Sequence, residues 1–206
     1  MKPKYFENAS YLSWGLTALL IPTKFKNERE YWYALLGGSL LFPFEWFADN
    51  HMLYMKYSEE FTPLISHEFM PLFMFFAYGW FFCTTLIANL RFEEQLDAMP
   101  LWKQISLLYA IFCVWDFAVE YSSTSYGFWT YSSNVKKIGN LPWHVPFAVS
   151  IVNVSLYYLT KFARKRSEGK SWLEGFMIHV ASYWTFMISG AALGKKLQKR
   201  LGHHAV

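Results

Sequence analysis

Charged side chains are scarce in this sequence. They make up 17% of its 206 residues, whereas 54% are hydrophobic and 21% are aromatic. An ordinary soluble domain carries roughly 25% charged residues, so the composition argues against a soluble protein. The few charges also gather between long apolar runs, as expected of loops that separate membrane spans. We therefore expect an integral membrane protein.

Cysteines and metal-binding patterns are nearly absent as well. The two thiols, Cys83 and Cys113, both lie within apolar runs, where a thiol behaves as a small buried hydrophobe. Two such residues provide neither a disulfide framework nor a zinc knuckle. The six histidines include no pair with a spacing diagnostic of haem or of a metal, so we expect no metal and no cofactor.

The sequence also lacks a linker, which predicts a single domain over residues 1–206. Its densest basic segment, residues 195–200, suits lipid headgroups better than nucleic acid. The lipid bilayer is accordingly an expected partner and nucleic acid is not, while the oligomeric state stays open.

Long apolar segments dominate what is present, and they predict an all-α integral membrane fold with about six transmembrane helices. Crossing a hydrocarbon core of about 30 Å takes roughly 20 helical residues. Five segments are long enough, at residues 31–49, 64–90, 101–121, 141–162 and 173–193, and a sixth at residues 9–22 is shorter. We therefore expect a multi-pass protein that forms one helical bundle.

A pattern of paired carboxylates occurs twice. Glu45 and Asp49 end the second predicted span, and Asp116 and Glu120 end the fourth. The acids of each pair are four residues apart, which is about one helical turn, so they share a helix face. Because the second and fourth spans run in the same direction, a pseudo-duplicated helix pair would place all four acids around one cavity.

Each acidic pair is followed by a tyrosine-rich loop and by a proline that opens the next predicted span. Pro63 precedes His67 and Glu68 in the first copy, and Pro142 precedes His144 in the second. A neutral imidazole can remove a proton or orient an acid. His67 and His144 are therefore candidate bases, and Glu68 is a candidate secondary acid.

Paired acids in an apolar setting predict acid catalysis. Burial disfavours the charged form of a carboxyl, and a second carboxyl nearby disfavours double ionisation, so one group can keep its proton at neutral pH. Such an acid can protonate an alkene or an epoxide of a lipophilic isoprenoid, and aromatic faces can stabilise the carbocation. We expect Asp116 and Glu45 to be the principal acids, with Glu120 and Asp49 as secondary acids. The candidate substrate-binding residues are aromatic neighbours in the sequence: Trp46, Trp115, Tyr126, Trp129 and Tyr131.

The second copy also resembles the signature of a known family. Trp115-Asp116 at a helix end is followed by the loop Gly127-Phe-Trp-Thr-Tyr131 and by Leu141-Pro142. This stretch resembles the small integral-membrane lycopene cyclases and, more loosely, the related carotenoid hydratases and membrane-bound terpene cyclases. Those cyclases are built from tandem three-helix units and close rings on linear carotenoids by proton-initiated cyclisation without net redox change.

The resemblance implies roles for three residues. Asp116 would be an active-site acid, and Trp129 and Tyr131 would line the substrate cavity. One departure limits the comparison, because the family places acidic residues after the proline whereas this sequence continues with Trp143 and His144. The resemblance therefore implies isoprenoid cyclisation or hydration without naming the substrate.

Three other functions fit parts of the pattern. The two acidic pairs could bind magnesium and a prenyl diphosphate, as in a magnesium-dependent prenyltransferase. Repeated units with intramembrane acids are also typical of membrane transporters, although here the acids lie near the ends of their spans. A lipid-binding or cofactor-binding protein is the third alternative.

Overall fold

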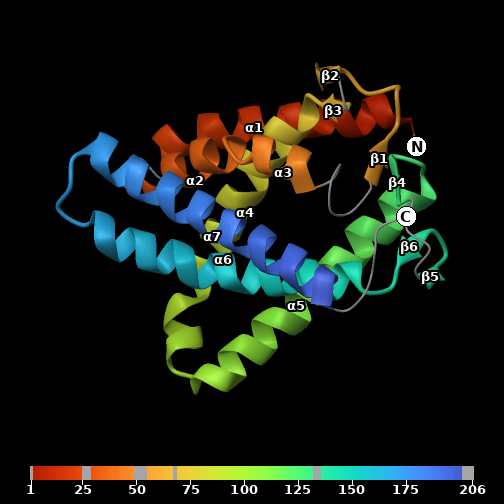
Figure 1. Ribbon diagram of the computed structural model, residues 1–206. Coiled ribbons are helices and arrows are strands. Elements are labelled where there is room, and N and C mark those ends of the chain that lie inside the picture. Colours follow the sequence, from red (N-terminus) through yellow and green to blue (C-terminus); the bar gives the residue numbers. More distant parts are fainter. Residues whose placement is uncertain (1, 25–28, 49–54, 67–68, 132–135, 201–206) are drawn as a thin grey trace.

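The computed structural model in Figure 1 describes residues 2–24, 29–48, 55–66, 69–131 and 136–200. Within these ranges the chain is mostly helical, with seven helices and three short two-stranded sheets. The helices are α1 (Pro3–Lys24), α2 (Glu30–Ser39), α3 (Phe42–Ala48), α4 (Phe73–Asp97), α5 (Leu101–Ser125), α6 (Val145–Ser167) and α7 (Trp172–Arg200). The strands are β1 (Met55–Tyr57), β2 (Pro63–Ile65), β3 (Met70–Pro71), β4 (Trp129–Tyr131), β5 (Lys137–Ile138) and β6 (Leu141–Pro142).

Fewer helices qualify as membrane spans than the sequence suggests. In the described part of the chain, α5 and α6 are long and apolar enough to cross a membrane. Helix α4 adds a third span if its two arms, bent by 45° between Ile87 and Leu90, are counted together. By length and composition the structure therefore holds two or three candidate spans, not the six expected from the sequence.

The span expected at residues 31–49 is broken into two helices. Helix α2 has 10 residues and α3 has 7, so each is too short to cross a bilayer alone. The break has a local cause, because Pro43 has no N–H to donate and its ring conflicts with the carbonyl four residues earlier. That carbonyl belongs to Ser39, the residue at which α2 ends.

Short strands replace the beginnings of two other predicted spans, so the fold is not purely α-helical. Residues from 64 onward were expected to be helical, but Pro63 pairs with Pro71 in the β2–β3 hairpin and α4 begins only at Phe73. Pro142 likewise lies in the β5–β6 hairpin, just before α6. Proline favours an extended residue before it and donates no hydrogen bond, which suits these edge strands.

The two halves of the chain are joined by a two-stranded sheet made of β1 and β4. Strand β1 pairs antiparallel with β4, with Met55 opposite Tyr131 and Tyr57 opposite Trp129. Each of these strands follows one of the acidic segments, and each is followed by a hairpin and a long helix. The first region (α3, β1–β3 and α4) and the second region (α5, β4–β6 and α6) therefore share one order of elements.

Close helix packing surrounds α4 of the first region. Helix α2 packs on α4 and α7, and α1 packs on α4, whereas α5 packs mainly on α6. Gly79 of α4 permits the close approach, because a Cβ atom there would lie 2.5 Å from the Leu35 carbonyl oxygen and 2.8 Å from Trp14 Nε1. Figure 1 shows α6 and α7 running side by side, with the α4–α5 hairpin projecting from the bundle.

Candidate functional site

Asp116 is buried at the interface between α5 and α6. The Asn153 side-chain amide donates to both carboxylate oxygens, at 3.2 and 3.1 Å, and the Ser150 hydroxyl lies 3.0 Å from Oδ2. Ser150 is also 2.5 Å from the Pro146 carbonyl oxygen, so its single proton is shared and Asn153 is the firmer donor. These donors hold Asp116 in place as an acceptor.

Glu120 lies one turn further along α5 and is held by strand β4. Its Oε2 atom accepts one hydrogen bond from Trp129 Nε1 and one from the Tyr131 hydroxyl, both at 2.9 Å. Both aromatic side chains are buried. The structure therefore brings together an acid and two aromatic residues that the sequence predicts for the site.

Glu45 reaches the same place from the other half of the chain. It lies in α3, partly buried, and the Tyr78 hydroxyl of α4 donates a hydrogen bond to its carboxyl group. Glu45 also lies close enough to Glu120 for the two carboxyls to repel each other, and Glu120 in turn is close to Asp116. We call Glu45, Asp116 and Glu120 the carboxyl cluster.

Other predicted acids and bases are not part of this cluster. Asp49, His67 and Glu68 lie outside the described residues. His144 is half-buried at the start of α6 with its ring 6.0 Å from that of Trp143, and within the described chain its imidazole makes no hydrogen bond to a carboxylate. Burial lowers the pKa of His144 below its usual value, which favours the neutral imidazole.

The remaining aromatic candidates lie in different surroundings. Trp46 packs against the apolar cluster around β1 and β4. Tyr126 is 52% exposed, and its ring is 5.7 Å from that of Phe128. Trp115 points to another face of α5 from that of Asp116 and lines a cavity between α4 and α5.

That cavity has a volume of about 480 Å³. Its lining is apolar apart from two threonines and one glutamine, and it contains no charged side chain: Phe81, Thr84, Thr85, Phe92, Gln95, Leu96, Met99, Leu107, Leu108, Ile111, Phe112 and Trp115. The Thr84 hydroxyl is satisfied by carbonyl oxygens of its own helix, both at 3.0 Å. The cavity therefore offers an almost continuous hydrocarbon surface.

The carboxyl cluster lies beyond one end of this cavity on both helices. On α5, Phe112 lines the cavity and Asp116 follows four residues later, about 6 Å along the axis. On α4, Phe81 lines the cavity, and Tyr78, which contacts Glu45, is one turn earlier. The lining thus comes within about one helical turn of Asp116 on α5 and of Tyr78 on α4, although none of the three acids lines the cavity.

Sequence reasoning missed the residues that hold the acids. Ser150 and Asn153 are polar residues three apart in an apolar helix, and buried polar groups in such helices usually have a partner. The sequence therefore indicated that Ser150 and Asn153 have polar partners, but nothing in it shows which helix these two side chains face. Glu7 was also missed: it is fully buried, and it accepts hydrogen bonds from Lys4, Tyr11 and the Thr62 backbone at 2.7, 2.6 and 3.1 Å.

Within the described residues, no group of three or more histidine, cysteine, aspartate or glutamate side chains is arranged to hold a metal ion. Comparison of the chain with protein-family models, curated proteins and solved structures finds no match. The resemblance to small membrane lycopene cyclases therefore rests on the motif residues themselves and stays a prediction.

Proposed function

We propose that this protein is a multi-pass membrane enzyme that protonates an isoprenoid and drives its cyclisation or hydration without redox change. One observation carries the proposal: Glu45 on α3 and the hydrogen-bonded acids Asp116 and Glu120 on α5, from the two halves of the chain, lie near enough to interact electrostatically. Paired carboxyls with aromatic hydrogen-bond donors fit a proton donor better than a solvated headgroup contact.

The outer surface supports a membrane location. Several helices expose large apolar side chains that a soluble protein would bury. On α1 the exposed leucines recur at helical spacing, and on α5 the exposed face includes branched and aromatic residues: Leu12, Leu16, Leu19, Leu20, Ile111, Val114 and Trp115. We place the candidate spans α4, α5 and α6 in the bilayer, and the exposed leucines of α1 would also contact lipid.

The proton is assigned to the Glu45–Glu120 pair. Two neighbouring carboxyls away from bulk water cannot both ionise at low cost, so the pair retains one proton. Glu120 Oε2 already accepts two hydrogen bonds, which leaves Oε1 to carry and donate that proton. Asp116 accepts hydrogen bonds on both oxygens, so it serves as the fixed carboxylate that balances positive charge.

The reaction then balances without a redox partner. The carboxyl proton adds to the less substituted carbon of the terminal double bond and leaves a tertiary carbocation on the other carbon. A neighbouring double bond of the same molecule attacks the cation and forms the ring bond, and loss of one proton to a carboxylate regenerates the acid. If water captures the cation instead, the product is an alcohol, and the extra proton of that water passes to the carboxylate and regenerates the acid. The face of Trp129 is a candidate for stabilising the cation.

The test is isotope incorporation from heavy water. Protein in lipid nanodiscs is incubated in D₂O with linear carotenoids and with epoxidised isoprenoids, and the products are analysed by mass spectrometry. Cyclisation should yield an isomer carrying one deuterium from solvent, and Glu45→Gln and Glu120→Gln should each strongly lower its yield while the protein stays folded. Glu60→Gln, which changes an exposed carboxyl, is the matched control. Full activity of both variants, or no deuterium in the product, would contradict acid-initiated chemistry.

A further inference from the structure

We infer that the cavity between α4 and α5 binds the hydrocarbon tail of one isoprenoid molecule, which enters sideways from the bilayer, and that the α4–α5 turn limits the length of this tail. The orientation of the molecule rests on the proposed function, because its reacting end must face the carboxyl cluster. Binding of the tail itself does not depend on turnover, so experiments can reject the tail-binding site and the proposed reaction independently.

The lining defines the chemical class of the ligand. A volume of about 480 Å³ lies within the roughly 300–1,000 Å³ of small-molecule sites. The lining carries no lysine, arginine or other charge that would pair with a phosphate, and bringing a diphosphate there would leave buried charges unpaired. An uncharged hydrocarbon chain fits, whereas a prenyl diphosphate does not.

The cavity is long in the direction of the helices. On α4 its lining runs from Phe81 to Leu96, roughly 22 Å at 1.5 Å per residue before the bend is considered. Helix α5 runs back in the opposite direction from Met99 at the turn towards Trp115. One end therefore approaches the carboxyl cluster and the other ends at the turn.

One side of the cavity is open to the surroundings of the bundle. Three of its lining residues on α5 are substantially exposed: Leu107 by 41%, Ile111 by 55% and Trp115 by 50%. In a membrane this side faces lipid chains, so an isoprenoid dissolved in the bilayer can enter between α4 and α5 without crossing water.

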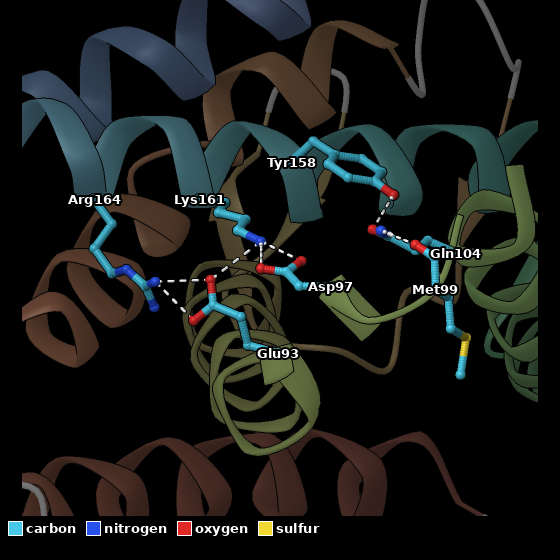
Figure 2. A network of polar contacts seen from close by, with 7 residues as sticks. All are labelled: Glu93, Asp97, Met99, Gln104, Tyr158, Lys161 and Arg164. Carbon is cyan, nitrogen blue, oxygen red and sulfur yellow. Dashed lines mark hydrogen bonds and ion pairs between the residues drawn. The ribbon is translucent and has the colours of Figure 1, made fainter. Parts of the chain in front are cut away.

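The far end of the cavity is fixed by polar contacts, shown in Figure 2. Lys161 Nζ lies 2.6 Å from both Asp97 carboxylate oxygens, and Arg164 Nη2 lies 2.8 and 2.7 Å from those of Glu93. Gln104 donates to the Met99 carbonyl at 2.9 Å. These contacts tie the α4–α5 turn to α6, and the Met99 side chain points away from the network and lines the cavity.

The first experiment maps the tail by photolabelling. Asp116→Asn protein in phosphatidylcholine nanodiscs is irradiated with a linear C20 isoprenoid alcohol that carries a diazirine at its hydrocarbon end, and the labelled residues are found by mass spectrometry. Labelling should fall on Phe92, Leu96 or Met99 and should be competed by unlabelled isoprenoid alcohol but not by added phospholipid.

Filling the cavity should remove this labelling. Thr85→Trp is the blocking variant, and Ile111→Trp replaces it if the first does not fold. Ile151→Trp is the matched control, because Ile151 lies on α6 outside the cavity and is 59% exposed. Labelling lost in the blocked variant and kept in the control supports the site. Labelling spread over outward residues such as Ile151, or displaced by phospholipid, overturns it.

The length limit gives a second readout. Met99→Trp should shift labelling towards shorter isoprenoid alcohols, and Met99→Ala should shift it towards longer ones. An unchanged length preference in both variants would overturn the role of the turn. If wild-type protein is labelled in the cavity but converts no isoprenoid, the proposed reaction fails while the tail site stands.

Discussion

The first and second regions follow the same order of elements but hold their acids differently. In the second region Asp116 and Glu120 lie on α5, an unbroken helix of 25 residues, and four side chains donate hydrogen bonds to them. In the first region Glu45 lies on α3, a helix of 7 residues, where Tyr78 is its donor. The second region therefore holds acids rigidly, whereas the first presents one from a short element.

This difference suggests a division of labour. A rigid carboxylate suits the stabilisation of positive charge at a fixed point, because a preorganised group needs no rearrangement during the reaction. An acid on a short helix, such as Glu45, can adjust its position towards a substrate. In the proposed mechanism Glu45 shares one proton with Glu120 of the second region. The two regions would then be complementary and not interchangeable.

The largest effect should come from removing either of the two carboxyls, Glu45 or Glu120, that share the proton. Glu45→Gln and Glu120→Gln should each lower turnover roughly 10²- to 10⁴-fold, the usual contribution of a general acid, because either change removes one of the two carboxyls that share the proton. The measurement is the rate of product formation in nanodiscs, with Glu174→Gln as the exposed control. If only one of the two variants loses activity, the proton belongs to one residue and not to the pair.

The next largest effect should be a loss of unfolding free energy when the hydrogen-bond donors to Asp116 and Glu45 are removed. Asn153→Leu should cost about 2–3 kcal/mol of unfolding free energy, because it leaves the buried Asp116 carboxylate without its main donor. Tyr78→Phe keeps the ring and should cost about 1 kcal/mol, the net value of one hydrogen bond. Unfolding in mixed micelles with increasing sodium dodecyl sulfate measures both. A larger loss for Tyr78→Phe would reverse the comparison between the regions.

The sequence placed Glu45, Asp116 and Glu120 on helices, as the structure does, whereas their role as site residues stays a prediction. The four-residue spacing and the repeat pointed to Glu45, Asp116 and Glu120, because helical periodicity is a local property. The break before Pro43 was not predicted, since prolines are common in membrane helices whose neighbours can satisfy the freed groups. Hydropathy alone does not reveal whether such a proline bends a helix or ends it.

The strands and the hydrogen-bond partners of the acids could not be predicted from the sequence, for a different reason. The pairing of β1 with β4 joins segments far apart in the chain, and three-residue strands carry almost no periodic signal. Tyr78 and Asn153 could be recognised as polar residues in apolar helices, but their facing partners depend on how the helices pack. Tertiary contacts decided both features.

A smaller effect should show how close packing against α1 and α2 holds α4 of the first region. Gly79→Ala should cost about 1–3 kcal/mol, as overpacking does, because the added Cβ would meet the Leu35 carbonyl oxygen and Trp14 Nε1 at 2.5 and 2.8 Å. Gly15→Ala is the control, since its Cβ would have nothing within 4 Å, and it should be neutral or slightly stabilising. Equal stability of both variants in the same unfolding assay would mean that α2 and α4 can move apart freely.

The smallest effect should come from the ion pairs that join α4 of the first region to α6 of the second. The side chains of Lys161 and Asp97 are 32% and 48% exposed, so water screens their attraction, and Lys161→Met should cost at most about 1 kcal/mol. In 1 M salt, where the screening length falls to about 3 Å, wild type and variant should become nearly equal in stability. Lys170→Met serves as the control for loss of one exposed positive charge. A loss well above this range that persists in high salt would mean that charge, and not apolar packing, holds the two regions together, and that the α4–α5 turn depends on these contacts for its position.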